Sequence, residues 1–238
     1  MSSTETKSPF RSRGFIAAAV VVGIIVLAGI IALVTSLTRG GDPVTTAAPT
    51  AAASTEPSSA DASVCGLEGF EEESSLTTAP ENEWELVGTM AAPAEGSDAG
   101  PGEVDGTFRS CYAHTAEGAL FAVVGYVAVS SDARNASRLY ELLAAGDVRD
   151  ELEATPQEGE PSTERLQVAG FKVNSYTAEE ATIDVAWSST TQQGALISLP
   201  MVVRWEDGDW RLLISDAGLP YAPTQIQNLG GYIPWAGV

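Results

Sequence analysis

Residues 201–215 read MVVRWEDGDWRLLIS, and this stretch decides the fold class. The pair Asp207-Gly208 is a strong signal for a two-residue turn between antiparallel strands. The residues before the turn form the end of a strand that reaches Trp205. The chain returns from Trp210 to Ser215 with Leu212 and Ile214 on one face. The stretch therefore predicts a β-hairpin near the end of the chain.

Two more strand patterns lie upstream of this hairpin, at Arg165–Tyr176 and Ala181–Ser188, and the strand that enters the hairpin is Ala195–Trp205, interrupted by Pro200. In the second, Ile183, Val185 and Trp187 recur at period two, which is typical of a strand with one buried face. Asp184 alternates with them, so we expect it to point to solvent if the apolar face packs inward. Together the patterns predict a meander of four antiparallel strands.

Helical patterns precede the meander. Thr115 can cap a helix whose apolar residues recur at helical spacing through Val127. Further helices are expected at Ala136–Ala145, ended by Gly146, and at Val148–Ala154. Candidate strands at Trp84–Met90 and Thr107–Tyr112 come earlier still. Helices followed by a run of strands predict an α+β fold, with two or three helices packed on one face of a curved antiparallel sheet of four or more strands.

The N-terminal part has a different character. Gly14–Leu37 is apolar and uncharged, and as a helix it would be roughly 36 Å long, enough to cross a hydrocarbon core of about 30 Å. A cleaved signal peptide is the alternative, although its apolar run is usually shorter. Basic residues, including Arg11 and Arg13, precede the span, so residues 1–13 are expected in the cytoplasm and the remainder outside. The lipid bilayer is then the first expected partner.

Residues 38–63 are rich in Thr, Ala, Ser and Pro and contain no aromatic residue. Such a segment cannot bury enough apolar surface to fold, so it predicts a disordered tether. Its composition would also suit O-glycosylation, with a bare linker as the simpler interpretation. Residues 64–238 are expected to form one extracytoplasmic domain.

The chain contains two cysteines, Cys65 and Cys111, both in the segment placed outside the cytoplasm. An even pair in an oxidising compartment indicates a disulfide, with two buried thiols as the alternative. Closing this loop would stabilise the fold by about 4 kcal/mol in the chain-entropy model.

Composition limits the partners and the chemistry. The chain has 32 acidic and 12 basic residues and a formal net charge of -20, which argues against a nucleic-acid partner. His114 is the only histidine, and its place before a helix start suggests a structural hydrogen bond. The acidic run 206–209 lacks the spacing of a calcium loop, and Asn135-Ala136-Ser137 is a chance glycosylation sequon. We expect no catalytic residue, no metal and no cofactor.

The C-terminal stretch, residues 219–238, carries aromatic and apolar residues on a backbone rich in Pro and Gly. If it is exposed, Tyr232, Ile233 and Trp235 would form a partner surface, because Trp and Tyr anchor interfaces. The alternative, which we favour, is that the tail packs back and completes the core.

The hairpin at 201–215 looks like the closing hairpin of NTF2-like (cystatin-fold) domains. An N-terminal anchor, a low-complexity tether and such a domain together resemble the bitopic assembly subunits of conjugation and type IV secretion machines. The stretches CYAHTAEGALFA (111–122) and GGYIPWAGV (230–238) also resemble uncharacterised actinobacterial membrane proteins. The resemblance implies a non-enzymatic subunit in the cell membrane that contacts other envelope proteins and can form a homo-oligomer. The alternative that it implies is a small-ligand binding module that uses the NTF2-like cone.

Overall fold

The computed structural model describes residues 62–236 and confirms the predicted α+β class. The predicted membrane span, and nearly all of the predicted tether, lie outside this described part. Among residues 62–236, no helix has the length and apolar character that crossing a bilayer requires. The elements, in chain order, are β1 (Trp84–Val87), β2 (Met90–Pro93), β3 (Glu103–Asp105), β4 (Phe108–Ser110), α2 (Ala116–Ser130), the 3₁₀ helix η3 (Ala133–Leu142), α3 (Asp147–Ala154), β5 (Leu166–Tyr176), β6 (Glu180–Ser189), β7 (Ala195–Glu206), β8 (Asp209–Leu212), β9 (Thr224–Ile226) and β10 (Ile233–Pro234).

A six-stranded antiparallel sheet forms the larger part of the domain. Its strand order is β10-β5-β6-β7-β8, and β9 also pairs with β7. The turn between β7 and β8 has positive φ angles at Asp207 (54°) and Gly208 (78°), as the Asp-Gly signal predicts for a two-residue hairpin. The four strands of the predicted meander are therefore all present and consecutive in the sheet, but the last, β8, has four residues and ends at Leu212 rather than at Ser215 as predicted.

Pro200 lies in the middle of β7 without breaking it. On one side of β7, Pro200 is opposite Asp184 of β6. On the other side, β8 pairs with residues 203–206 and β9 with residues 196–198, so neither strand reaches Pro200. A proline lacks a backbone N–H, and this gap between two neighbouring strands is a place where the donor is not needed.

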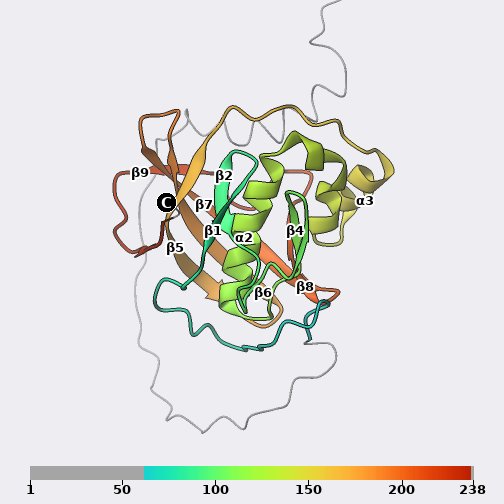
Figure 1. Cartoon of the computed structure of the whole chain (residues 1–238), viewed down its shortest axis with the longest axis horizontal. Helices are drawn as coiled ribbons and strands as arrows, with labels where there is room; N and C mark the ends of the chain where they lie inside the picture. Colours follow the sequence, from blue (N-terminus) through green and yellow to red (C-terminus); the bar gives the residue numbers. More distant parts are fainter. Residues whose placement is uncertain (1–61, 237–238) are drawn as a thin grey trace, which may run out of the picture.

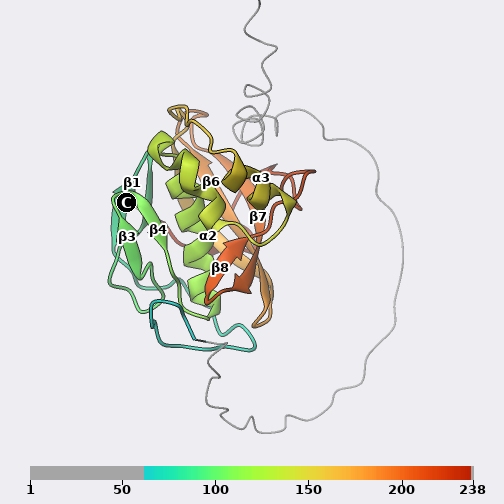
Figure 2. The same ribbon diagram turned by 90° about the vertical axis from the view of Figure 1, so that its right-hand side faces the viewer.

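Helix α2 is the centre of the fold. Most of its length is buried on every side, and the side chain of Thr115 caps it by accepting a hydrogen bond from the Gly118 N–H, as the sequence predicts. Figure 2 shows why: the large sheet lies on one side of α2, and the small hairpins β1–β2 and β3–β4 lie on the other. A helix that is apolar all round is expected in such a three-layer arrangement.

Two of the sequence predictions for the segments before β5 are wrong in detail. The expected single strand over Trp84–Met90 is a hairpin, because Gly88 takes a positive φ of 58° and turns the chain between β1 and β2. A side chain at Gly88 would also collide with Ser131, so the turn requires glycine. The helix expected at Ala136–Ala145 is instead a 3₁₀ helix that begins and ends earlier.

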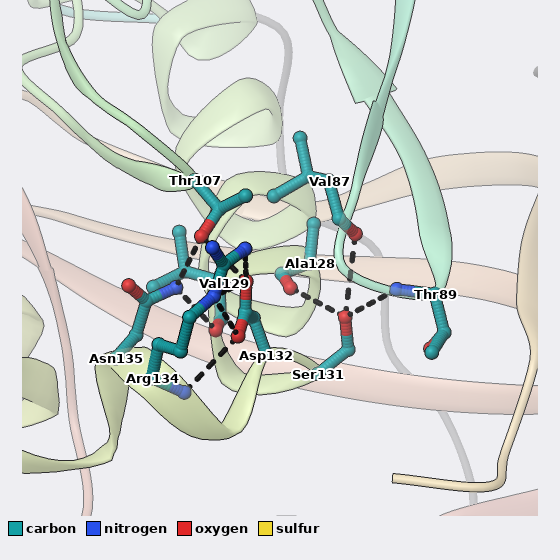
Figure 3. A network of polar contacts seen from close by, with 9 residues as sticks. All are labelled: Val87, Thr89, Thr107, Ala128, Val129, Ser131, Asp132, Arg134 and Asn135. Atoms are coloured by element: carbon teal, nitrogen blue, oxygen red, sulfur yellow. Dashed lines mark hydrogen bonds and ion pairs between the residues drawn. The ribbon is translucent and has the colours of Figure 1, made fainter. Parts of the chain in front are cut away.

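Polar contacts hold the end of α2 against the two hairpins (Figure 3). The Ser131 hydroxyl donates to the Ala128 carbonyl and accepts from the Thr89 N–H. Asp132 accepts hydrogen bonds from Arg134 and from the Thr107 hydroxyl, and the Arg134 bond, with help from Thr107, holds the pKa of Asp132 well below its usual range. These bonds fix the turn from α2 into η3.

The sequon residue Asn135 belongs to the same network (Figure 3). It is buried, and its side-chain amide donates to the Val129 carbonyl at 3.0 Å and to the Thr107 hydroxyl at 3.2 Å. The match to a glycosylation sequon is therefore explained by a structural asparagine whose amide nitrogen is already engaged.

The C-terminal tail crosses the outer face of the large sheet, the face away from α2. It pairs with β7 at one edge through β9 and with β5 at the opposite edge through β10 (Figure 1). At the second edge, a Cβ on Gly170 would lie 2.8 Å from the Ile233 carbonyl oxygen, so glycine permits the close approach.

Candidate functional site

The two cysteines are joined where the described chain begins. Cys65 and Cys111 form a disulfide with a Cα–Cα distance of 6.2 Å. The Ser63 hydroxyl lies 3.0 Å from the Cys111 sulfur, and the Val64 N–H donates to the Gly208 carbonyl in the β7–β8 turn. The first residues of the domain are thus fixed both to the segment before α2 and to the closing hairpin.

Asp209, in that same hairpin, orders the segment around Cys111. Its carboxylate is 1 % exposed and accepts backbone N–H bonds from Cys111 and Tyr112, each at 2.9 Å. Burial raises the pKa of Asp209, while Arg211, 3.4 Å away, and the backbone donors oppose the increase. A buried carboxylate that is fully engaged by backbone donors is explained as a structural group.

The interior between α2, β4 and the closing hairpin contains one described cavity of about 10 Å³. Arg109 of β4, Tyr112 and Tyr126 contribute its polar lining. Burial raises the pKa of Tyr126 to about 12, so its phenol stays neutral across the physiological range. The remaining lining residues are apolar or aromatic and come from α2, η3, β7 and β8: Ala122, Leu142, Val203, Trp210 and Leu212.

His114 is buried (2 % exposed) among aromatic rings. Its ring stacks on Trp205 with centroids 3.8 Å apart, and Phe70 and Trp210 meet it edge-on. Its Nε2 lies 2.5 Å from the Ala178 carbonyl oxygen, which fixes Nε2 as the protonated nitrogen. The geometry agrees with the structural hydrogen bond expected from the sequence, and it encloses the ring rather than presenting it to a substrate.

The sequence predicted that the Asp184 side chain points to solvent, but the structure shows that it is buried. It is on the outer face of β6, opposite to Ile183 and Val185, but it is 2 % exposed. Three groups bind its carboxylate: the Ser198 hydroxyl at 2.8 Å, the Tyr232 hydroxyl at 2.9 Å and the Lys172 ammonium at 3.1 Å. The period-two pattern gave the correct direction, and the tail that covers the outer face accounts for the burial.

The candidate partner surface consisted of Tyr232, Ile233 and Trp235 of the tail. The structure packs these residues against the domain instead of exposing them together. Trp235 is 5 % exposed, and its indole contacts Trp84, Phe121 and Phe171. Its Nε1 donates to the Asn82 side chain at 2.9 Å. Tyr232 covers Asp184, and Ile233 pairs with Phe171 in the sheet, each of them half-buried. The structure therefore supports the packed tail, and an exposed surface built on Trp235 is wrong because this side chain completes the core.

A shallow groove lies beside the start of α2. Its acidic lining residues are Glu68, Glu81, Asp98 and Glu117. Burial, with the nearby carboxylates of Glu71 and Asp98, raises the pKa of Glu117. No group of three or more His, Cys, Asp or Glu side chains within residues 62–236 has the arrangement of a metal site.

The geometry described so far spans nearly the whole of a region that matches a family model, "Domain of unknown function (DUF8175)", over residues 44–234. The chain belongs to the DUF8175 family. It matches no curated protein and no solved structure. The match also begins before the described residues, so the DUF8175 region includes part of the stretch that we expect to be a tether.

The burial of two polar groups of this DUF8175 domain was not predicted from the sequence, in which Asp209 was considered only as part of the acidic run 206–209. Arg109 carried no signal, because a lone arginine in a short polar strand is normally exposed. Asp209 had a partial signal, since it directly follows the Asp-Gly turn, where its carboxylate could reach neighbouring backbone donors. Both are positioned by partners distant in the sequence, which a local pattern does not reveal.

Proposed function

We propose that this DUF8175 protein is a non-enzymatic, membrane-anchored interaction subunit of an assembly in the cell envelope, similar in role to the bitopic subunits of conjugation and type IV secretion machines. The apolar stretch 14–37 would serve as the anchor, and residues 38–63 would set the distance between the membrane and the domain. A disulfide at the start of the domain favours the extracytoplasmic side. We also propose an NTF2-like arrangement, which the antiparallel sheet curved around α2 supports.

The observation that carries the proposal is the filled interior. Pockets for small molecules usually measure about 300–1,000 Å³, whereas the described cavity between the sheet and α2 is about 10 Å³. Trp210 and Leu212 of β8 fill the space that a ligand would need in a cone-shaped site. This favours contacts made on the outer surface over the alternative of a small-ligand binding module.

The placement of His114 and Asp184, the two groups weighed as catalytic candidates, argues against their acting as an acid or a base. An acid or base must reach the substrate proton within hydrogen-bond distance. His114 lies beneath Trp205 and Phe70, and Asp184 is engaged by Lys172 and covered by the tail. Neither group could act without displacement of the side chains that cover it.

Site-specific crosslinking in cells tests the interaction role. A photoreactive residue would replace Leu86 on β1 (73 % exposed), Tyr221 in the tail (47 % exposed) or Val64 at the start of the domain (63 % exposed). These positions lie on different parts of the surface and serve as controls for one another. We expect a reproducible crosslink to one envelope protein from one position and not from the other two. Absence of crosslinks from all three, together with a partner-free monomer in mild detergent, would contradict the proposal.

Protease treatment of intact cells tests the membrane topology separately. We expect externally added protease to cut within residues 38–63 and to release a disulfide-containing fragment, while residues 1–13 stay protected. Recovery of the intact chain in the soluble cytosolic fraction would contradict the anchor.

A further inference from the structure

The two cysteines of the disulfide differ in their access to solvent. Cys111 is 1 % exposed, whereas Cys65 is partly exposed and both of its neighbours in the chain are exposed. Exchange of a disulfide begins when a thiolate attacks one of the two sulfurs, so access decides which of them reacts. A thiol that approaches from outside therefore meets the Cys65 side of the bridge.

The hydrogen bonds to the two sulfurs are also unequal. The buried Ser63 hydroxyl lies 3.0 Å from the Cys111 sulfur and 3.6 Å from the Cys65 sulfur. Because neither sulfur of a disulfide carries a hydrogen, the hydroxyl is the donor. The Cys65 N–H also donates to the Cys111 sulfur, at 3.1 Å. The Cys111 sulfur thus accepts two close hydrogen bonds, which would stabilise a negative charge on it.

A carboxylate acts in the opposite direction. Asp209 lies near Cys111, whose backbone N–H it accepts at 2.9 Å, and its charge opposes a second negative charge on the sulfur. Arg211 pairs with Asp209 at 3.4 Å and reduces this repulsion. With the repulsion reduced, the two donors that bind the sulfur directly favour Cys111 as the sulfur that leaves.

We propose that Cys65 is a site of thiol–disulfide exchange with an extracytoplasmic protein that carries a reactive dithiol, and that Cys111 is the leaving thiolate. A partner thiolate attacks the Cys65 sulfur and forms a new S–S bond, while the bond to Cys111 breaks and its electron pair goes to the Cys111 sulfur. The second partner thiolate then attacks the partner's own sulfur in the mixed disulfide and releases Cys65. The partner is oxidised to a disulfide, the bridge is reduced, and the two protons of the partner dithiol go to the two cysteines.

The same steps in reverse form the bridge. Cys65 first joins the partner in a mixed disulfide, and the Cys111 thiolate then attacks the Cys65 sulfur and displaces the partner thiolate. This exchange rests on the extracytoplasmic location proposed above, because the partner must be on the same side of the membrane. It gives the proposed interaction subunit a transient covalent contact at the start of its domain.

Reaction of the purified full chain in detergent with reduced glutathione tests which sulfur is attacked. A monothiol leaves the mixed disulfide in place at early times, and alkylation then marks the cysteine that left. We expect mass spectrometry to find glutathione on Cys65 and the alkyl group on Cys111, in about tenfold excess over the opposite pattern. The chain unfolded in urea is the control and should give both patterns equally. Glutathione mainly on Cys111, or an even distribution in the folded chain, would overturn the proposal.

The variant Ser63→Ala tests the leaving group. Loss of one of the two donors to the Cys111 sulfur should slow the opening of the bridge by about five- to tenfold. Ser215→Ala, which removes a hydroxyl bound to the Gly218 carbonyl, is the matched control and should leave the rate unchanged. A merely structural role of Ser63 would loosen the bridge and speed its opening, so an unchanged or faster rate would contradict the stabilised leaving thiolate. Because the purified chain is used, neither result depends on the membrane topology, which the protease experiment tests separately.

Discussion

The two faces of β6 are both buried, but different interactions keep them so. On the inner face, Ile183, Val185 and Trp187 are at most 1 % exposed and pack in the core around α2. On the outer face, Asp184 is equally inaccessible, and its carboxylate has Lys172 and two hydroxyl groups as partners. The inner face depends on volume and shape, while the outer face depends on specific hydrogen bonds beneath the tail.

This difference shows which structural information the alternation of residues along a strand can give. Alternation of apolar and polar residues fixes which way each side chain points. Whether the polar face is exposed depends on a segment elsewhere in the chain, here residues 227–234, which cross from β9 at one edge of the sheet to β10 at the other. Four variants or conditions can separate the two kinds of burial.

The largest effect is expected on the inner face. Ile183→Ala removes buried volume from the core and should lower the free energy of unfolding by about 2–5 kcal/mol. Urea unfolding of the full chain in detergent, followed by tryptophan fluorescence, measures it. Leu86→Ala, an exposed strand residue, is the control and should change stability by less than about 0.5 kcal/mol. Equal effects of the two variants would mean that β6 does not pack on α2.

A smaller loss is expected on the outer face. Asp184→Ala leaves the hydroxyls of Ser198 and Tyr232 without their acceptor and should lower the free energy of unfolding by about 1–3 kcal/mol. Adding Lys172→Met to this variant should recover part of the loss, because it removes the ammonium that Asp184 no longer pairs. An additive double variant would argue against direct coupling between Lys172 and Asp184.

The hydrogen bond from Tyr232 in the tail to Asp184 in the sheet is expected to contribute less than the whole Asp184 cluster. Tyr232→Phe removes only the hydroxyl that donates to Asp184, so we expect a loss of about 0.5–1.5 kcal/mol in the same unfolding assay. Tyr221→Phe removes a hydroxyl from a tyrosine that is 47 % exposed and should leave stability unchanged. If the two substitutions are indistinguishable, the tail does not bind the sheet through Tyr232.

The smallest effect is a dependence on alkaline pH. Burial raises the pKa of Tyr232, and the hydrogen bond to Asp184 adds to the increase. Burial alone would lower the pKa of Lys172, but the hydrogen bond and charge of Asp184 outweigh it and raise this pKa. For both groups the folded state keeps its proton to higher pH than the unfolded state, so the stabilisation is complete below about pH 10 and is lost as pH rises beyond it. Lys172→Met with Tyr232→Phe should flatten this decline, and an unchanged slope would contradict the contribution of the cluster.

Local patterns predicted the parts of the fold that local chemistry determines. The Thr115 cap, the alternation in β6 and the Asp-Gly hairpin each lie in the structure where the sequence places them. Three of the four shortest strands, β3, β9 and β10, were not predicted, because two or three residues hold little periodic signal; the fourth, β4, lies within the candidate strand Thr107–Tyr112. The hairpin at Gly88 was missed because a single glycine reads equally well as part of a strand.

The candidate sites were less predictable than the fold. The tail covers Asp184 and Glu85 pairs with Arg109, and both of these partners lie in other segments of the chain. A sequence pattern shows that a carboxylate or guanidinium is present, but its partner is decided by tertiary contacts. The packing of Trp235 was one of two open alternatives, and the structure distinguishes them because it places Trp84 and Phe121 against the indole.

The position of the disulfide determines how the domain would respond to mechanical tension. A pull on the N-terminal side would first load the hydrogen bond from Val64 to Gly208, and would then reach Cys65 and pass through the sulfur bridge to Cys111, in the segment before α2. The intervening residues, which contain both small hairpins, form a covalently closed loop that carries no load. Force would then be transmitted to the backbone N–H groups held by Asp209, and so to the closing hairpin. Tension applied to the chain before residue 62 would therefore leave β1 to β4 folded, provided that the bridge stays oxidised.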